Sequence, residues 1–233
     1  MKVAAIVPAY NEEQRICRVL SVVEQAPLVD EVWVVNDGST DRTAEVIPRD
    51  NGVRTLHLPR NVGKGGALLA GANTTDAEVL VFVDADLVGL TPDHVDELVR
   101  PVLADEADMS VGVFRGGRYW TDLAQRLVPN ISGQRAIKRE IFLSVPRLDR
   151  TRYGVEVAMT RHLAVSGKRV AKVPLFGVTH VMKEEKLGLP LGVLSRLRMY
   201  RDMCTCMLYG LLFDRRLRNG HRNGNGHGAG SGV

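Results

Sequence analysis

Two carboxylates stand two positions apart directly after an apolar run. Asp84-Ala85-Asp86 follows residues 79–83, a run typical of a buried strand. Carboxylate oxygens at a strand end suit Mg²⁺ or Mn²⁺, usually with a bound diphosphate completing the coordination shell. The same residues also suit a polar turn that leads into the next helix. The pattern alone leaves both interpretations open.

Other polar groups narrow the class of ligand. Residues 36–41, Asn-Asp-Gly-Ser-Thr-Asp, suit a helix-capping loop, and Asp37 also suits a hydrogen bond to a ribose or a nucleobase. A dinucleotide-binding Rossmann domain would need glycines in its first turn, and residues 8–12 contain none. The glycine-rich residues 63–66 are not a P-loop, because Lys64 is followed by glycine instead of Ser or Thr. NAD-binding and ATPase functions are therefore excluded.

The elements that must position these residues alternate between strand and helix. We expect strands at 3–7, 31–35, 53–58 and 79–83, and helices at 12–23, up to about 48, 63–73 and 91–103. This alternation predicts an α/β fold with a mostly parallel central sheet and helices on both faces. Ligands of such sheets bind at the carboxyl ends of the strands, where every polar group above is found. The sequence therefore predicts one shared site.

Four segments resemble, in order and spacing, the family 2 type of nucleotide-sugar glycosyltransferase, which has the GT-A fold. They are residues 7–13, 34–41, 61–67 and 84–86. The resemblance covers residues 3–105 and continues more loosely to about 185. It implies a metal-dependent enzyme that transfers a hexose from a UDP- or GDP-sugar.

The resemblance also assigns roles on the donor side. Nucleotide-sugar binding falls to Pro8, Tyr10, Asn11, Glu12, Asp37, Gly63, Lys64, Asp84 and Ala85. The Lys64 ammonium would offset the diphosphate charge. Asp86 would hold Mg²⁺ or Mn²⁺ as a catalytic group, and His180 looks like a further metal ligand.

The second half resembles glucosyl-3-phosphoglycerate synthases and polyprenyl-phosphate sugar transferases. This likeness places Gly133, Gln134, Arg135 and Tyr153 on the acceptor side. Glu156 would be the catalytic carboxylate that takes a proton from an acceptor hydroxyl. A polyprenyl phosphate or other lipid-linked group is the favoured acceptor, and glycerate or 3-phosphoglycerate is the alternative. The family 2 likeness implies inversion at the sugar, whereas the glycerate-type likeness implies retention.

The chain is expected to form one domain over residues 1–213. Residues 1–105 would bind the nucleotide sugar, 106–190 would form the acceptor side, 191–213 would be a C-terminal amphipathic helix, and 214–233 a disordered Gly- and Asn-rich basic tail. The apolar side of that helix suits peripheral contact with an anionic membrane. It equally suits packing on the sheet or on a second subunit of a homodimer. No apolar run is long enough for a spanning helix.

Charge and cysteine content bound the partners and the compartment. The net charge is +4, and the basic tail supplies most of it, so we expect no nucleic-acid partner. Three cysteines, an odd number, fit a cytoplasmic protein, with the inner face of the membrane as a further location. A nucleotidyltransferase and a non-catalytic nucleotide-binding protein are the other classes. Residues 8–12 lack the glycine-rich turn of the first, and the intact Asp84 and Asp86 argue against the second.

Overall fold

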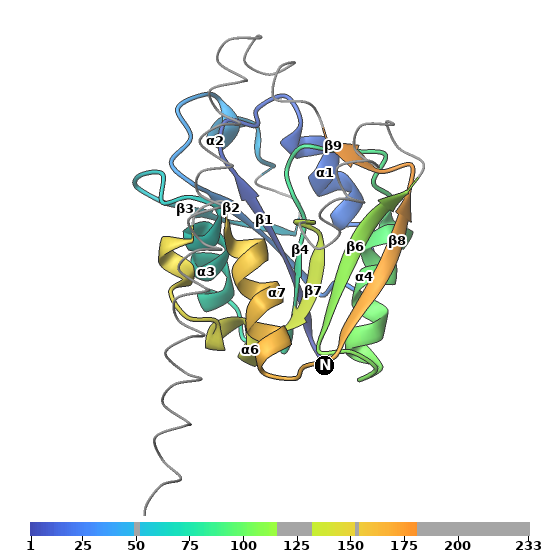
Figure 1. The fold of residues 1–233 in the computed structure, drawn as a ribbon. Coiled ribbons are helices and arrows are strands. Elements are labelled where there is room, and N and C mark those ends of the chain that lie inside the picture. The colour runs from blue at the N-terminus through green and yellow to red at the C-terminus, as the bar shows by residue number, and fades with distance from the viewer. Residues whose placement is uncertain (49–51, 116–131, 152–153, 181–233) are drawn as a thin grey trace, which may run out of the picture.

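A seven-stranded sheet forms the centre of the computed structural model (Figure 1), which describes residues 1–48, 52–115, 132–151 and 154–180. The strand order is β3-β2-β1-β4-β7-β6-β8, and a second sheet pairs β5 with β9. The strands are β1 (Val3–Ala9), β2 (Glu31–Asn36), β3 (Val53–His57), β4 (Val79–Phe82), β5 (Leu87–Val88), β6 (Met109–Arg115), β7 (Arg135–Lys138), β8 (Val170–Phe176) and β9 (Thr179–His180).

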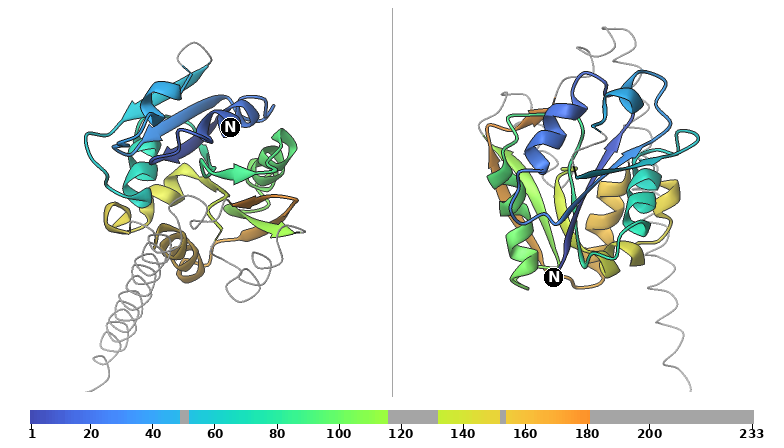
Figure 2. Two further views of the ribbon diagram at one scale, coloured as in Figure 1. Left: turned by 90° about the horizontal axis from the view of Figure 1, so that it is seen from above. Right: turned by 180° about the vertical axis from the view of Figure 1, so that it is seen from behind.

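Helices cover both faces of the sheet, as the alternation predicts (Figure 2). One face packs against α1 (Ile16–Val23) and α4 (Pro92–Leu103). The other packs against α3 (Lys64–Asn73), α6 (Arg139–Ser144) and α7 (Val155–Val165). Short elements complete the described part, namely α2 (Thr43–Val46) and the 3-10 turn η1 (Leu148–Arg150). The sheet therefore lies between two apolar layers.

Local sequence explains where these elements begin and end. In α1 the buried residues recur at helical spacing, at Ile16, Val19, Leu20 and Val23. Helix α4 begins with a reciprocal cap, in which the Thr91 hydroxyl accepts from the His94 N–H and His94 Nδ1 accepts from the Thr91 N–H. The helix expected from residue 12 begins only at Ile16, because residues 12–15 form a turn.

Strand β1 contains a proline, which central strands rarely tolerate. Pairing between β1 and β4 ends at Ile6 and Phe82. The Ile6 carbonyl points toward β4, where it accepts from the Val83 N–H, so position 8 points to the same side. Beyond residue 6 no paired β4 residue stands there to receive an N–H. Pro8 therefore removes no ladder hydrogen bond between these strands.

Strand β7 is an element at the site that the sequence does not predict. It runs antiparallel to both neighbours, with Phe82 of β4 opposite Arg135 and Val111 of β6 opposite the same residue. It brings residues 132–134 to the carboxyl end of β4. The proposed helix 191–213 and tail 214–233 lie outside the described residues, and the division of the chain into regions stays a prediction.

Candidate active site

The loops after β1 and β2 are joined by hydrogen bonds. Asn11 adopts a left-handed conformation, with φ of 57°, and its Oδ1 accepts from the Thr40 N–H at 2.9 Å. The Asn11 and Glu12 N–H groups donate to the hydroxyls of Ser39 (3.1 Å) and Thr43 (2.8 Å). The two predicted nucleotide-binding loops therefore form one rigid rim, on which the Tyr10 side chain is exposed.

Asp37 extends this rim to the start of α3. Its side chain is buried, and its two oxygens accept from the N–H groups of Val62 (2.7 Å) and Gly63 (2.9 Å). Gly63 has a φ of 87°, which glycine adopts without strain, and Lys64 follows as the first residue of α3. Asp37 thus fixes the loop that positions Lys64. A nucleobase contact for Asp37 stays a prediction.

Lys64 bridges two carboxylates from distant parts of the chain. Its Nζ lies 2.6 Å from Asp84 Oδ1 and 2.6 Å from Glu156 Oε1. Asp84 follows β4, and Glu156 lies in the first turn of α7. Burial disfavours the ammonium, but the charges of Asp84 and Glu156 outweigh burial and raise the pKa of Lys64 above its ordinary value. The lysine therefore stays protonated at neutral pH.

The segment before β7 holds the other oxygen of Asp84. Gln134 Nε2 donates to Asp84 Oδ2 at 3.0 Å, and the Ser132 hydroxyl donates to Gln134 Oε1 at 2.9 Å. A Cβ at Gly133 would overlap both Asp84 Oδ2 and Lys64 Nζ. Gly133 therefore supplies the space that the ion pair occupies.

Asp86 lies beside the small second sheet. Leu87 of β5 pairs with His180 of β9. Because Asp86 directly precedes Leu87, the backbone of His180 lies near Asp86. The side chain of His180 and the whole of Tyr153 lie outside the described residues. Within the described residues, no three side chains of the types His, Cys, Asp and Glu form a group that could hold a metal ion.

Comparison with known proteins decides the family. Residues 4–162 match the family model described as glycosyl transferase family 2. The chain belongs to this family. The family match confirms the resemblance drawn from the four segments, and the solved structures described below confirm the GT-A fold.

Relatives of this family 2 protein include enzymes with small-molecule acceptors and enzymes with lipid-linked acceptors in their names. Glucosyl-3-phosphoglycerate synthase of Mycobacterium tuberculosis strain H37Rv is 30% identical over 195 residues, covering 67% of this chain and 59% of the relative. A dolichyl-phosphate beta-glucosyltransferase of Trichomonas vaginalis is 41% identical over 97 residues, covering 36% of this chain and 30% of the relative. The chain therefore spans about six tenths of the length of the synthases it matches.

Solved structures agree with the first group. The M. tuberculosis synthase in complex with Mn²⁺, UDP-glucose and phosphoglyceric acid superposes with a TM-score of 0.71 at 28% identity. The match covers 90% of this chain and 79% of that chain. A complex of the same synthase with Mg²⁺ and UDP has a TM-score of 0.70.

Arg135, which the resemblance places on the acceptor side, is buried. Arg135 has no exposed surface, and its guanidinium contacts Ser132, Thr160 and Met109 beneath the ion pairs. Its side chain is therefore inside the protein, and an acceptor-side role for Arg135 stays a prediction. The resemblance includes Ser132 in the acceptor-side segment, but sequence reasoning misses Thr160, because a single hydroxyl on a helix has no distinctive sequence pattern.

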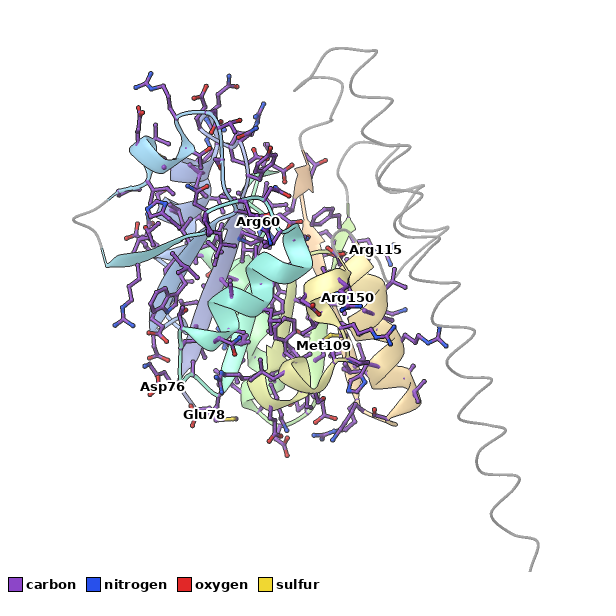
Figure 3. All side chains as sticks on the ribbon, turned by 90° about the vertical axis from the view of Figure 1, so that its left-hand side faces the viewer. Arg60, Asp76, Glu78, Met109, Arg115 and Arg150 are labelled. Carbon is purple, nitrogen blue, oxygen red and sulfur yellow. The ribbon has the colours of Figure 1, made fainter. Side chains whose placement is uncertain are left out.

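The charged groups of the described part are unevenly distributed. Arg60 follows β3, and Arg115 ends β6, so both lie toward the carboxyl ends of these strands (Figure 3). Asp76 and Glu78 lie at the opposite end, before β4 (Figure 3). Arg60 and Arg115 are thus two cations at the end of the sheet that also carries the carboxylates of Asp37 and Asp84. No helix in the described residues has the length and apolar character needed to cross a membrane.

Proposed function

We propose that this glycosyltransferase moves glucose from UDP-glucose to a hydroxyl of a small phosphorylated acid of the 3-phosphoglycerate type. The observation that carries the proposal is the bridge from Lys64 to Asp84 and Glu156. It joins the predicted donor side of the site to the predicted acceptor side through one cation. The match to the M. tuberculosis synthase with both substrates bound, over 90% of this chain, supports the same pairing of ligands.

The residues present fit a divalent cation. Asp84 and Asp86 offer the carboxylate oxygens that Mg²⁺ and Mn²⁺ prefer. Asp86 would hold the ion, with Asp84 beside it and His180 as the further ligand. When bound, the cation would supply Lewis-acid stabilisation of the leaving diphosphate.

The protein's own groups have distinct tasks in this proposal. The Lys64 ammonium would hydrogen-bond the diphosphate, because it already stands beside Asp84 as a charged donor. The Glu156 carboxylate would accept the hydroxyl hydrogen of the acceptor and so hold its oxygen toward the sugar. Asp37 would keep the loop before Lys64 in place through its bonds to Val62 and Gly63.

A lipid-linked phosphate acceptor is the second candidate. The identity of 41% to the dolichyl-phosphate glucosyltransferase favours it, but that match covers only 36% of this chain. The match to the phosphoglycerate enzyme covers 67%. We therefore place the phosphoglycerate type first, which reverses the order expected from the sequence. The segment 191–213, on which membrane contact depends, lies outside the described residues.

The proposal is tested by offering UDP-glucose and GDP-glucose with 3-phosphoglycerate or a short polyprenyl phosphate in detergent, each with Mn²⁺, Mg²⁺ or EDTA. We expect release of UDP and a phosphoglycerate product heavier by one hexose residue, only with metal. Lys64→Met should lower kcat by about 100-fold or more, since the diphosphate loses a charged donor. The exposed variant Glu140→Gln, on α6, is the matched control.

Two other outcomes would contradict this proposal. Transfer to the polyprenyl phosphate alone would replace the first candidate by the second. Absence of thermal stabilisation by UDP or GDP, with metal present, would overturn the transferase proposal for this chain.

A further inference from the structure

Arg135 is a fully buried arginine close to the candidate site. Arg135 is the first residue of β7, between β4 and β6, and its side chain is completely buried. Placing a guanidinium in the core costs several kcal/mol unless its N–H groups are well paired. The hydrogen bonds of a buried arginine therefore indicate what it does, and its partners are known here.

The guanidinium joins two separate elements. Its Nε donates to the backbone carbonyl of Ser132 at 2.8 Å, in the segment before β7. Its Nη1 donates to the hydroxyl of Thr160 at 2.8 Å, in α7, and lies 3.7 Å from Met109 Sδ. A planar group with donors in fixed directions can do this, whereas a single lysine ammonium reaches one such direction at a time.

Each of these elements is tied to one of the two acidic residues that Lys64 contacts, the segment 132–134 to the Asp84 side chain and α7 to Glu156, which it carries. On one side, the Ser132 hydroxyl holds Gln134, which donates to Asp84. On the other side, the Thr160 hydroxyl donates to the backbone carbonyl of Glu156, one helical turn earlier, at 2.8 Å. Arg135 is therefore linked to the side chain of Asp84 through Ser132 and Gln134, and to the backbone of Glu156 through Thr160.

Charge agrees with this arrangement. Burial lowers the pKa of Arg135 to about 10, while the charges of Glu156 and Asp84 oppose that shift. The arginine is therefore cationic at neutral pH. Two cations, Lys64 and Arg135, face the carboxylates of Asp84 and Glu156, one from the site and one from beneath it.

We propose that Arg135 is a positioning residue for glycosyl transfer, which fixes the segment 132–134 to α7 and so sets the separation of Asp84 and Glu156 that Lys64 spans. The proposal rests on the proposed function for its activity readout. It assigns no contact between Arg135 and either substrate. Its effect is expected on kcat. If the two carboxylates are misplaced, the bound donor and acceptor are poorly oriented toward each other and react more slowly.

Hydroxyl and guanidinium variants test the proposal in the full chain. Thr160→Val removes the hydrogen bond from Arg135 to α7. Arg135→Lys keeps the positive charge but can make only one of the two hydrogen bonds, to Ser132 or to Thr160. We expect each to lower kcat by about 10-fold or more, with the KM for UDP-glucose within about twofold of wild type. Thr160→Ser keeps the hydroxyl and should restore kcat. Thr160→Val keeps the proposal testable if variants of the buried arginine do not fold.

The matched control is Arg139→Met. Arg139 also donates through its Nε to a backbone carbonyl, that of Ala72, at 3.0 Å, but away from Lys64. It should lower stability without changing kcat. If Thr160→Val and Arg135→Lys keep the wild-type kcat as Arg139→Met does, Arg135 is structural and the proposal is overturned.

A crystal structure of Thr160→Val separates this proposal from the proposed function. We expect Lys64 Nζ to remain within about 4 Å of only one of the two carboxylates. An unchanged double bridge would overturn the positioning role, whatever the acceptor. If wild type uses a different acceptor, the same variants are compared with that acceptor, and only the proposed function is revised.

Discussion

At the scale of single residues, the site depends on a position that has no side chain. A Cβ at Gly133 would overlap Asp84 Oδ2 and Lys64 Nζ, both at the ends of flexible side chains. We expect Gly133→Ala to displace this ion pair and to lower the transfer rate by about 10- to 100-fold. The free energy of unfolding should change by less than about 1 kcal/mol, because side-chain ends can move aside. Initial rates and urea unfolding measure the two effects.

Gly52→Ala is the matched control for that substitution. A Cβ at Gly52 would have no neighbouring atom within 4 Å. This variant should keep the wild-type rate. The explanation for Gly133 is wrong if Gly133→Ala is as active as Gly52→Ala.

The buried charges of the site illustrate a conflict between stability and chemistry. Lys64 and Arg135 are both largely removed from water, as is Glu156. Replacing buried ion pairs by apolar residues of similar volume is often neutral or stabilising. Their presence in this fold therefore fits the roles proposed above, ligand binding by Lys64 and Glu156 and positioning by Arg135, better than a role in the stability of the core.

At the scale of elements, the donor side depends on the contact between two loops. Gly38 lies in the loop after β2 with a φ of 64°, and a Cβ there would come within 2.6 Å of the Arg60 backbone. Backbone atoms cannot move aside as side-chain ends do. We expect Gly38→Ala to lower the free energy of unfolding by about 2–4 kcal/mol and to weaken UDP binding, because the loop carrying Asp37 must shift. Urea unfolding and calorimetric titration with UDP measure these changes.

Gly167→Ala separates strain from overlap. Gly167 has a nearly equal φ of 63°, but a Cβ there would meet no atom within 4 Å. This variant should lose only about 1 kcal/mol, the cost of the left-handed backbone alone. Equal losses in the two variants would show that the approach of the two loops contributes nothing.

The elements differ in how far the sequence predicts them. Strands β1, β2 and β4 are continuous apolar runs, so their position and the site at their carboxyl ends could be predicted. Strand β7 could not, because a four-residue strand that begins with a buried arginine and ends in lysine has no strand pattern. Its orientation depends on pairing with β4 and β6, which lie far away in the sequence.

The candidate site shows the same division. Asp84, Lys64 and Glu156 were expected at one site, from motifs that resemble the family. Their direct bridge is tertiary information, since Lys64 and Glu156 are 92 positions apart. The role of Thr160 follows only from the packing of α7 on β7, which no local pattern encodes.

At the scale of the whole molecule, the candidate site and a cluster of ion pairs around Asp108 lie at opposite ends of the sheet. Arg60 and Arg115 lie near the carboxyl ends of the strands, while Asp76 and Glu78 lie at the other end (Figure 3). Near that other end, Asp108 precedes β6, and it accepts from the Arg169 N–H at 2.9 Å and pairs with Lys138 at 3.3 Å. Changes to Asp108 should therefore act on stability without acting on transfer.

The pH dependence of unfolding tests this separation. Burial opposes ionisation of Asp108, but hydrogen bonds from Arg169 and Lys138 outweigh it and lower its pKa from 3.8 to about 2. The stabilisation is complete above the unfolded value of 3.8 and is lost as the pH falls through about 2. We expect Asp108 to contribute up to about 2 kcal/mol at neutral pH, all of it lost between about pH 4 and pH 2. Urea unfolding across this range measures the loss.

Substitution of Asp108 should remove that part of the acid dependence. Asp108→Asn is expected to be less stable than wild type at pH 7 and to approach it near pH 2, because the protonated aspartate also lacks the charge. Its transfer rate at pH 7 should equal that of wild type, since β6 and β8 pair over residues 109–115 without help from the site. Glu140→Gln, an exposed change on α6, should follow the wild-type curve throughout. A difference between Asp108→Asn and wild type that stays constant from pH 7 to pH 2 would mean that packing, and not the charge of Asp108, joins β6 to β8 at this end.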